Sequence, residues 1–372
     1  HLMKNLSIKT TEWIYKNILR RIFFLLDAEY VHEKMLNIGY LMGESPALKD
    51  MAKNLWQVEN PILWQTYAGI VFTNPVGLAA GFDYKAKLPH ILPSVGFGFE
   101  TIGTITNKPY EGNPKPRLGR LKKSQSLLVN KGFKNEGIEE IVKYLSGKQF
   151  EMPVGLSIGK TNSREASMSQ TEAVEDVISA FQVAESSYVP FSYYELNISC
   201  PNLFGNVEFY TPSHLRDLLS ALEKLNLSKS VFIKMPIDKN NEEIKQMLEV
   251  AIGFPVAGVI FGNLQKNRQD PALIPEEITK SQKGYFSGKP TEKRSNELIK
   301  LAYKNYGKKL IIIGCGGVFT AEDAYKKIKL GASLIQGITG MVYEGPQWAG
   351  AINMGLIQLL QKDGFNSISE AV

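Results

Sequence analysis

Short apolar runs alternate with amphipathic segments from about residue 55 to residue 372. The runs predict eight strands, at 76–80, 99–105, 152–158, 193–199, 230–235, 256–262, 310–315 and 333–338. Apolar residues at helical spacing predict helices between several of them, at 136–146, 170–186, 212–226, 240–252, 292–306 and 321–329. Eight strands alternating with helices favour an α/β fold of the (β/α)8 TIM-barrel type. A doubly wound sheet is the alternative.

The N-terminal region has a different pattern, in which apolar and aromatic residues dominate and basic residues are interleaved. Thr11 is placed to cap one helix and Asp27 a second, which Gly43, Ser45 and Pro46 end. Apolar helices with basic residues can lie in a membrane interface, or they can pack on the barrel as a cap. We therefore divide the chain into a small two-helix extension, residues 3–50, and a barrel, residues 51–372.

Composition narrows the class of protein. The chain has 372 residues, of which 44% are hydrophobic and 22% charged, as in folded globular proteins. The net charge is 43 − 37 = +6, too small to indicate a nucleic-acid partner. Two cysteines and four histidines indicate neither a disulfide framework nor a metal site. No apolar run approaches the roughly 18 to 20 residues of a membrane span.

Candidate chemistry lies at the predicted carboxyl ends of the strands, where barrels bind ligands. Asn197 and Asn202 flank Cys200 after the fourth strand. Their amides suit an imide or amide-rich ring, and the thiol can act as a nucleophile or base. Alternatively, Cys200 is a small buried apolar residue. Lys234, within an apolar strand, either faces a ligand charge or extends its amine to solvent at the strand end.

Glycine-rich loops follow the later strands. Gly316 and Gly317 follow the seventh strand, and Gly340 the eighth. Ser287 and Gly288, after the sixth strand, can form a third side of the same binding site. Backbone N–H groups in such loops bind phosphate, so the sequence predicts a phosphorylated cofactor. We interpret Cys315 as structural.

Six segments in this order resemble the dihydroorotate dehydrogenase family. They are 77–83, 96–104, 112–117, 197–202, 286–290 and 314–318. Residues 25–32 also resemble the helical extension of the membrane-linked, quinone-dependent class (class 2).

This resemblance implies oxidation of dihydroorotate to orotate in de novo pyrimidine biosynthesis, with bound FMN and a quinone acceptor. It implies that Cys200 is the base that removes a proton from C5 while C6 gives a hydride to the flavin. The implied cofactor-binding residues are Ala79, Ala80, Gly81, Thr104, Asn197, Lys234, Ser287, Gly288, Gly316, Gly317 and Thr339. The implied substrate-binding residues are Asn130, Asn197, Asn202 and Asn263.

For the quinone site the resemblance implies His32 and Arg120. It also implies peripheral membrane association, at the cytoplasmic face of the inner membrane if the source is bacterial.

The sequence departs from the family pattern within the site. Cys200 stands where the quinone-dependent class has serine, and Tyr84 where the family has lysine. An expected asparagine falls on Val129, with Asn130 one residue on. Further departures are Ser157, Leu264 and Ile338. Two alternatives follow: a diverged FMN oxidoreductase acting on another cyclic amide or imide, or a non-catalytic barrel scaffold.

Overall fold

A computed structural model describes residues 2–165, 167–278 and 282–372, and it contains a closed barrel of eight parallel strands. The strands are β3 (Val76–Leu78), β4 (Phe99–Ile105), β7 (Val154–Ile158), β8 (Tyr193–Asn197), β9 (Ser230–Met235), β10 (Val256–Phe261), β12 (Ile311–Cys315) and β13 (Leu334–Gly337). Each pairs with the next, and β13 pairs with β3 to close the barrel. All eight predicted strands are confirmed, and the doubly wound alternative is wrong.

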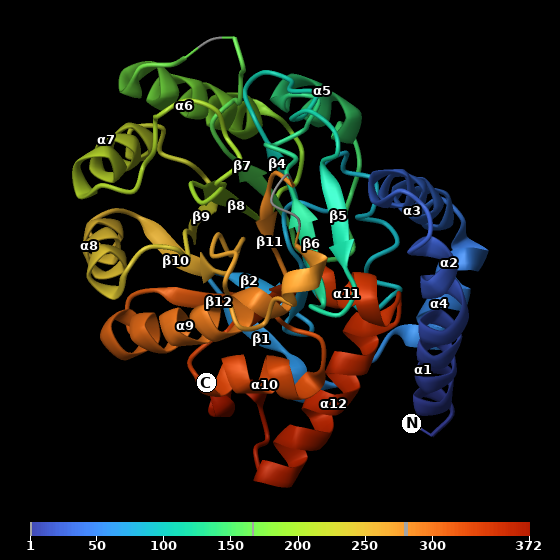
Figure 1. The fold of residues 1–372 in the computed structure, drawn as a ribbon. Coiled ribbons are helices and arrows are strands. Elements are labelled where there is room, and N and C mark those ends of the chain that lie inside the picture. Colours follow the sequence, from blue (N-terminus) through green and yellow to red (C-terminus); the bar gives the residue numbers. More distant parts are fainter. Residues whose placement is uncertain (1, 166, 279–281) are drawn as a thin grey trace.

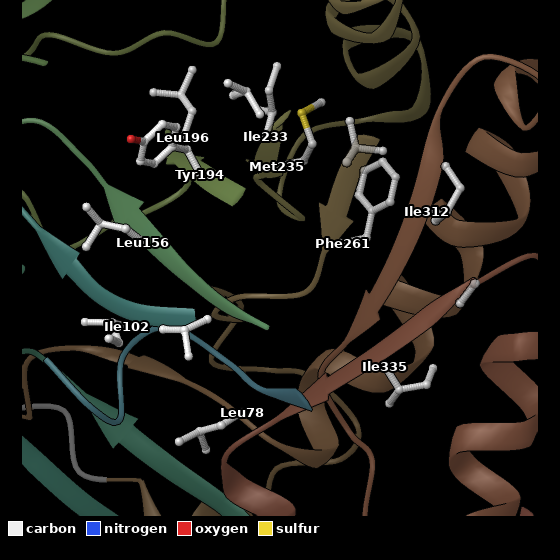
Figure 2. Packing of buried hydrophobic residues seen from close by; sticks show 14 of the residues in the cluster. Leu78, Ile102, Leu156, Tyr194, Leu196, Ile233, Met235, Phe261, Ile312 and Ile335 are labelled. Atoms are coloured by element: carbon white, nitrogen blue, oxygen red, sulfur yellow. The ribbon is translucent and has the colours of Figure 1, made fainter. Parts of the chain in front are cut away.

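Helices surround the barrel (Figure 1). They are α5 (Ile138–Leu145), α6 (Gln170–Ser186), α7 (Pro212–Glu223), α8 (Asn241–Ala251), α9 (Glu292–Tyr306), α10 (Ala321–Lys329) and α12 (Trp348–Asp363). Figure 2 shows the main apolar cluster, in which Leu156, Ile233 and Ile312 are strand residues and fully or almost fully buried. Burial of these strand side chains together with the helices' apolar faces holds the two layers together.

Several smaller elements were not predicted. The hairpin of β1 (Gln65–Tyr67) and β2 (Ile70–Phe72) brings the Phe72 ring to 5.3 Å from that of Phe99, the first residue of β4. A three-stranded sheet joins β5 (Leu118–Leu121), β6 (Ser126–Val129) and β11 (Tyr285–Phe286). The short helix α11 (Thr339–Glu344) follows β13 directly.

The extension contains the two predicted helical regions, but its first boundary differs. α1 (Leu2–Ile14) continues through a π-helical turn, Tyr15–Leu19, into α2 (Arg20–Phe23). Thr11 therefore lies inside the helix, and the predicted cap there is wrong: its hydroxyl donates to the Ser7 carbonyl and accepts from the Trp56 indole at 3.0 Å. The second prediction is confirmed, because Asp27 accepts from the Tyr30 amide at the start of α3 (Ala28–Gly43).

A further helix, α4 (Pro46–Trp56), was not predicted. Ser45 and Pro46 end α3 as expected, but they also begin α4, in which Ser45 is the N-cap and Pro46 the first residue. α4 runs across residues 50 and 51, so continuous helix joins the two proposed units. In the part of the chain that the structure describes, no helix is both long and apolar enough to cross a membrane.

Candidate active site and apolar passage

A cavity of about 480 Å³ lies at the carboxyl ends of the barrel strands and extends to the N-terminal helices. Almost every site residue named from the sequence lines it: Cys200, Ala79, Ala80, Gly81, Thr104, Asn197, Lys234, Ser287, Gly288, Gly316, Gly317, Thr339, Asn202, Asn263, His32 and Arg120. Asn130 does not line it. The Asn130 side chain instead accepts a hydrogen bond from Asn113 at 3.0 Å, so it stabilises the loop behind the cavity wall.

Three asparagines surround Cys200 in the first part of the cavity. Asn197, the last residue of β8, donates to the Thr104 hydroxyl at 2.7 Å. Asn263 donates to the carbonyl and hydroxyl of Ser199, and Asn202 to the Val129 carbonyl at 3.0 Å. Among the residues that the structure describes, the side-chain oxygens of Asn202 and Asn263 accept no hydrogen bond. These two oxygens are therefore available to the N–H groups of a ring in the cavity.

Burial dominates the chemistry of Cys200. It raises the pKa of the thiol to about 11, although a hydrogen bond from the Asn202 backbone N–H and the charge of Lys234 lower this pKa. The thiol is therefore protonated at neutral pH. Cys315, the last residue of β12, also lines the cavity, and burial raises its pKa as well.

The second part of the cavity fits an anionic, phosphorylated group. The hydroxyls of Ser287 and Thr339 lie 2.7 Å apart. Gly288, Gly316 and Gly317 have positive φ angles of 77°, 94° and 70°, which allow tight loops with amides available to an anion. Lys234 is only 3% exposed, and none of the described carboxylates forms an ion pair with it. A buried ammonium without a counter-ion favours a ligand that carries negative charge.

The departures from the family pattern occupy structural as well as cavity positions. Ser157 bonds to Thr104 at 2.9 Å and to Glu195 at 2.7 Å. Tyr84 donates to Glu33 on α3, so its hydroxyl is already engaged. Leu264 and Ile338 line the cavity as apolar side chains.

The third part of the cavity is an apolar passage between the extension and the barrel. Its lining residues on or near the extension helices include Tyr15, Leu19, Phe23, Phe24, Val31, Met35, Ile38 and Met42. Arg120 lies at this passage, with its guanidinium 4.8 Å from the Phe24 ring centre and bonded to the Leu26 carbonyl at 2.8 Å. His32 bonds to the Phe82 carbonyl at 2.8 Å, and burial lowers its pKa to about 3.

A network of charges between α3 and the barrel loops was missed from the sequence. Glu29 pairs with Arg117 at 3.2 Å and Lys134 at 2.9 Å. Glu33 pairs with Lys85 at 2.8 Å and Lys134 at 3.3 Å. The four-residue spacing of the two glutamates, which places them on one face of a helix, was the only available signal.

Comparisons with known proteins agree with this geometry. The family model described as "Dihydroorotate dehydrogenase" matches residues 62–360. A protein of Christiangramia forsetii, "Dihydroorotate dehydrogenase (quinone)", is 37% identical over 93% of this chain and 99% of its own length. One of Mycolicibacterium smegmatis with the same name is 34% identical over 95% of this chain and 98% of its own. The crystal structure of ligand-free DHODH from Eimeria tenella matches with a TM-score of 0.81 and 27% identity, over 93% of this chain and 98% of that one.

The Cys200 environment predicts slow alkylation at neutral pH. Only the thiolate reacts, so the rate constant for modification by iodoacetamide should rise about tenfold per pH unit and level off only near pH 11. The measurement is mass-spectrometric labelling of the intact protein between pH 6 and pH 11, with Cys200→Ala to identify the site. A plateau below pH 9 would contradict the raised pKa.

Proposed function

The chain belongs to the dihydroorotate dehydrogenase family and oxidises dihydroorotate to orotate with a quinone acceptor, and we propose that FMN is its flavin and Cys200 its catalytic base. The observation that carries this proposal is the single cavity. It joins a polar ring site with Cys200 and Lys234, an anion site with Ser287, Thr339 and the glycine loops, and an apolar passage to the extension. A non-catalytic scaffold has no use for this combination of buried polar groups.

The donor set fits a flavin with one terminal phosphate. Ser287, Gly288, Gly316, Gly317 and Thr339 would hold the phosphate with hydroxyls and backbone amides. Ala79, Ala80, Gly81, Thr104 and Asn197 would contact the ring, and Lys234 would offset negative charge on it. When bound, FMN would supply the hydride acceptor for oxidation of dihydroorotate at C6 and the electron donor for the quinone.

The protein's own contribution at the ring site is orientation and proton removal. Asn197 and Asn202 present amides from the end of β8 and the loop after it, and Asn263 from the loop after β10, so a cyclic imide would be held by several hydrogen bonds at once. The Cys200 thiolate takes the proton from C5. Because its pKa is raised, the thiolate is a minor form at neutral pH but a stronger base when it forms.

The passage fits a quinone because its walls are apolar and it reaches the extension. His32 and Arg120 are the polar groups from the sequence prediction that line it, and we propose that they contact the quinone. His32 would do so as a neutral imidazole, since burial holds its pKa far below 7.

We also propose peripheral membrane association through the extension, at the cytoplasmic face of the inner membrane if the source is bacterial. Many large apolar side chains of its helices are exposed: Met3, Leu6, Trp13, Ile14, Ile18, Leu19, Ile22, Leu25, Leu26, Tyr30, Ile38 and Leu41. Large apolar side chains exposed in such number on one short segment favour insertion into a lipid interface. Nearby Lys9, Arg20 and Arg21 favour anionic lipids.

Cys200→Ala tests the base. The variant should retain flavin but reduce it with dihydroorotate at least about 100-fold more slowly, because only proton removal is lost. The measurement is anaerobic stopped-flow mixing at the oxidised-flavin absorbance. Cys200→Ser is the matched control and should retain partial activity whose rise with pH is displaced upward. An unchanged rate in the alanine variant would remove Cys200 from the reaction.

The double variant Trp13→Glu/Leu25→Glu tests membrane binding. These residues are 60% and 81% exposed, so the fold should be unaffected, but binding to vesicles of phosphatidylethanolamine and phosphatidylglycerol should fall about tenfold or more. Co-sedimentation with vesicles is the measurement. Tyr188→Glu, at a fully exposed site outside the extension, is the control and should bind as the unmodified protein does. Equal binding by the double variant would exclude the extension as the contact surface.

A further inference from the structure

Lys131 is a cavity residue to which neither the sequence motifs nor the proposed mechanism assign a role. It lies on the loop after β6, is partly buried, and lines the cavity. Its amine lies 2.8 Å from the His32 Nδ1 atom and 4.7 Å from the centre of the Tyr84 ring. Burial lowers the pKa of this amine to about 7. Such a group costs free energy unless the cavity offers it a partner when the protein is at work.

The surrounding charges leave Lys131 without a counter-ion. Four basic side chains gather here (Lys85, Arg117, Lys131 and Lys134), against the two carboxylates Glu29 and Glu33. Glu29 pairs with Arg117 and Lys134, and Glu33 pairs with Lys85 and Lys134. No carboxylate of the described residues forms an ion pair with Lys131. The cluster therefore has an excess of positive charge, and its unpaired member faces the cavity.

The loop fixes Lys131 relative to the ring site. Asn113 donates from its backbone amide to the Lys131 carbonyl at 3.1 Å and from its side chain to the Asn202 carbonyl at 2.9 Å. Asn202 in turn donates to the Val129 carbonyl, two residues before Lys131. The lysine loop and the segment that carries Cys200 are thus bonded to each other, so a molecule held by Asn202 lies in the same enclosed space as the Lys131 amine.

His32 orients this amine. If its Nε2–H donates to the Phe82 carbonyl, its Nδ1 carries a lone pair that accepts one of the three N–H bonds of Lys131. Two N–H bonds of the ammonium remain, enough for both oxygens of a carboxylate. The low pKa of His32 keeps the imidazole neutral, so it does not repel the ammonium.

We propose that Lys131 binds the carboxylate of dihydroorotate and orotate and thereby selects carboxylated rings over the parent imide. This inference rests on the proposed function. An incoming carboxylate would balance the excess positive charge and stabilise the protonated amine. It would also give the site a recognition group that Tyr84 cannot supply, because the Tyr84 hydroxyl is held by Glu33.

The test compares Lys131→Met with Lys134→Met, which removes a charge from the same cluster but one already paired with Glu29 and Glu33. Orotate binding to the flavin-loaded protein is measured by calorimetry, and KM and kcat for dihydroorotate by stopped flow. Lys131→Met should raise the orotate dissociation constant and the KM about 10- to 100-fold, with kcat nearly unchanged. Lys134→Met should change both by less than about threefold. Lys131→Arg should recover part of the affinity.

A neutral ligand separates recognition of the carboxylate from general damage to the site. The methyl ester of orotate has the same ring without the charge, so both the unmodified protein and Lys131→Met should bind it with equal affinity. If Lys131→Met weakens binding of the ester as much as binding of orotate, or weakens the binding of neither ligand, the proposal is wrong. If the unmodified protein is not reduced by dihydroorotate, the proposed function fails instead, whatever the variants do.

The pH dependence is a second readout. Orotate affinity of the unmodified protein should fall as pH rises from 7 to 9, because the free amine loses its proton in this range, while Lys131→Met should show no such fall. The groups that face the amine do not explain the change. The pKa values of Glu29, Glu33 and His32 lie below this range, and that of Tyr84 lies far above it. A flat profile for the unmodified protein would contradict the proposal.

Discussion

The contact between α3 and the barrel loops determines what kind of cavity this protein has. Glu29 and Glu33 lie one turn apart on α3 and bind cations from three loop segments, at Lys85, Arg117 and Lys134. Each carboxylate has two basic partners, so it stays paired when one cation is lost, whereas loss of a carboxylate would leave a partly buried cation without its counter-ion. With α3 held there, the open mouth of the barrel becomes an enclosed space with one polar end and one apolar end.

The two ends of the cavity follow from two different sources of side chains. Parallel strands in register place Asn197 beside Lys234 at the barrel's carboxyl end, which supplies the polar groups. The extension supplies apolar residues from helices whose opposite side is also apolar and exposed. The extension thus forms one wall of the cavity and also an exposed apolar surface of the molecule. His32 of the extension and Lys131 of the barrel both line the cavity and are bonded to each other across the join.

The sequence was sufficient to predict the barrel and to name most of the residues that line the cavity, because both depend on local signals. Each buried strand is a continuous apolar run, and the glycine and asparagine motifs follow these runs directly. The Thr11 cap failed because tertiary contacts, including that of the Trp56 indole, take the hydroxyl within a longer helix. Asn130 does not line the cavity, and its side chain accepts a hydrogen bond from Asn113 instead. These side-chain contacts depend on partners that are distant in sequence, so a local sequence pattern does not predict them.

Burial disfavours the charged form of both Cys200 and Lys131. It raises the thiol pKa to about 11 and lowers the amine pKa to about 7, so at neutral pH the thiol is protonated and the amine is only partly charged. A carboxylated ring changes this balance. Its charge favours the protonated amine, and displacement of water strengthens every remaining electrostatic interaction. The carboxylate does not react, so its contact with Lys131 adds binding energy to the ground state and the transition state alike and lowers KM rather than raising kcat.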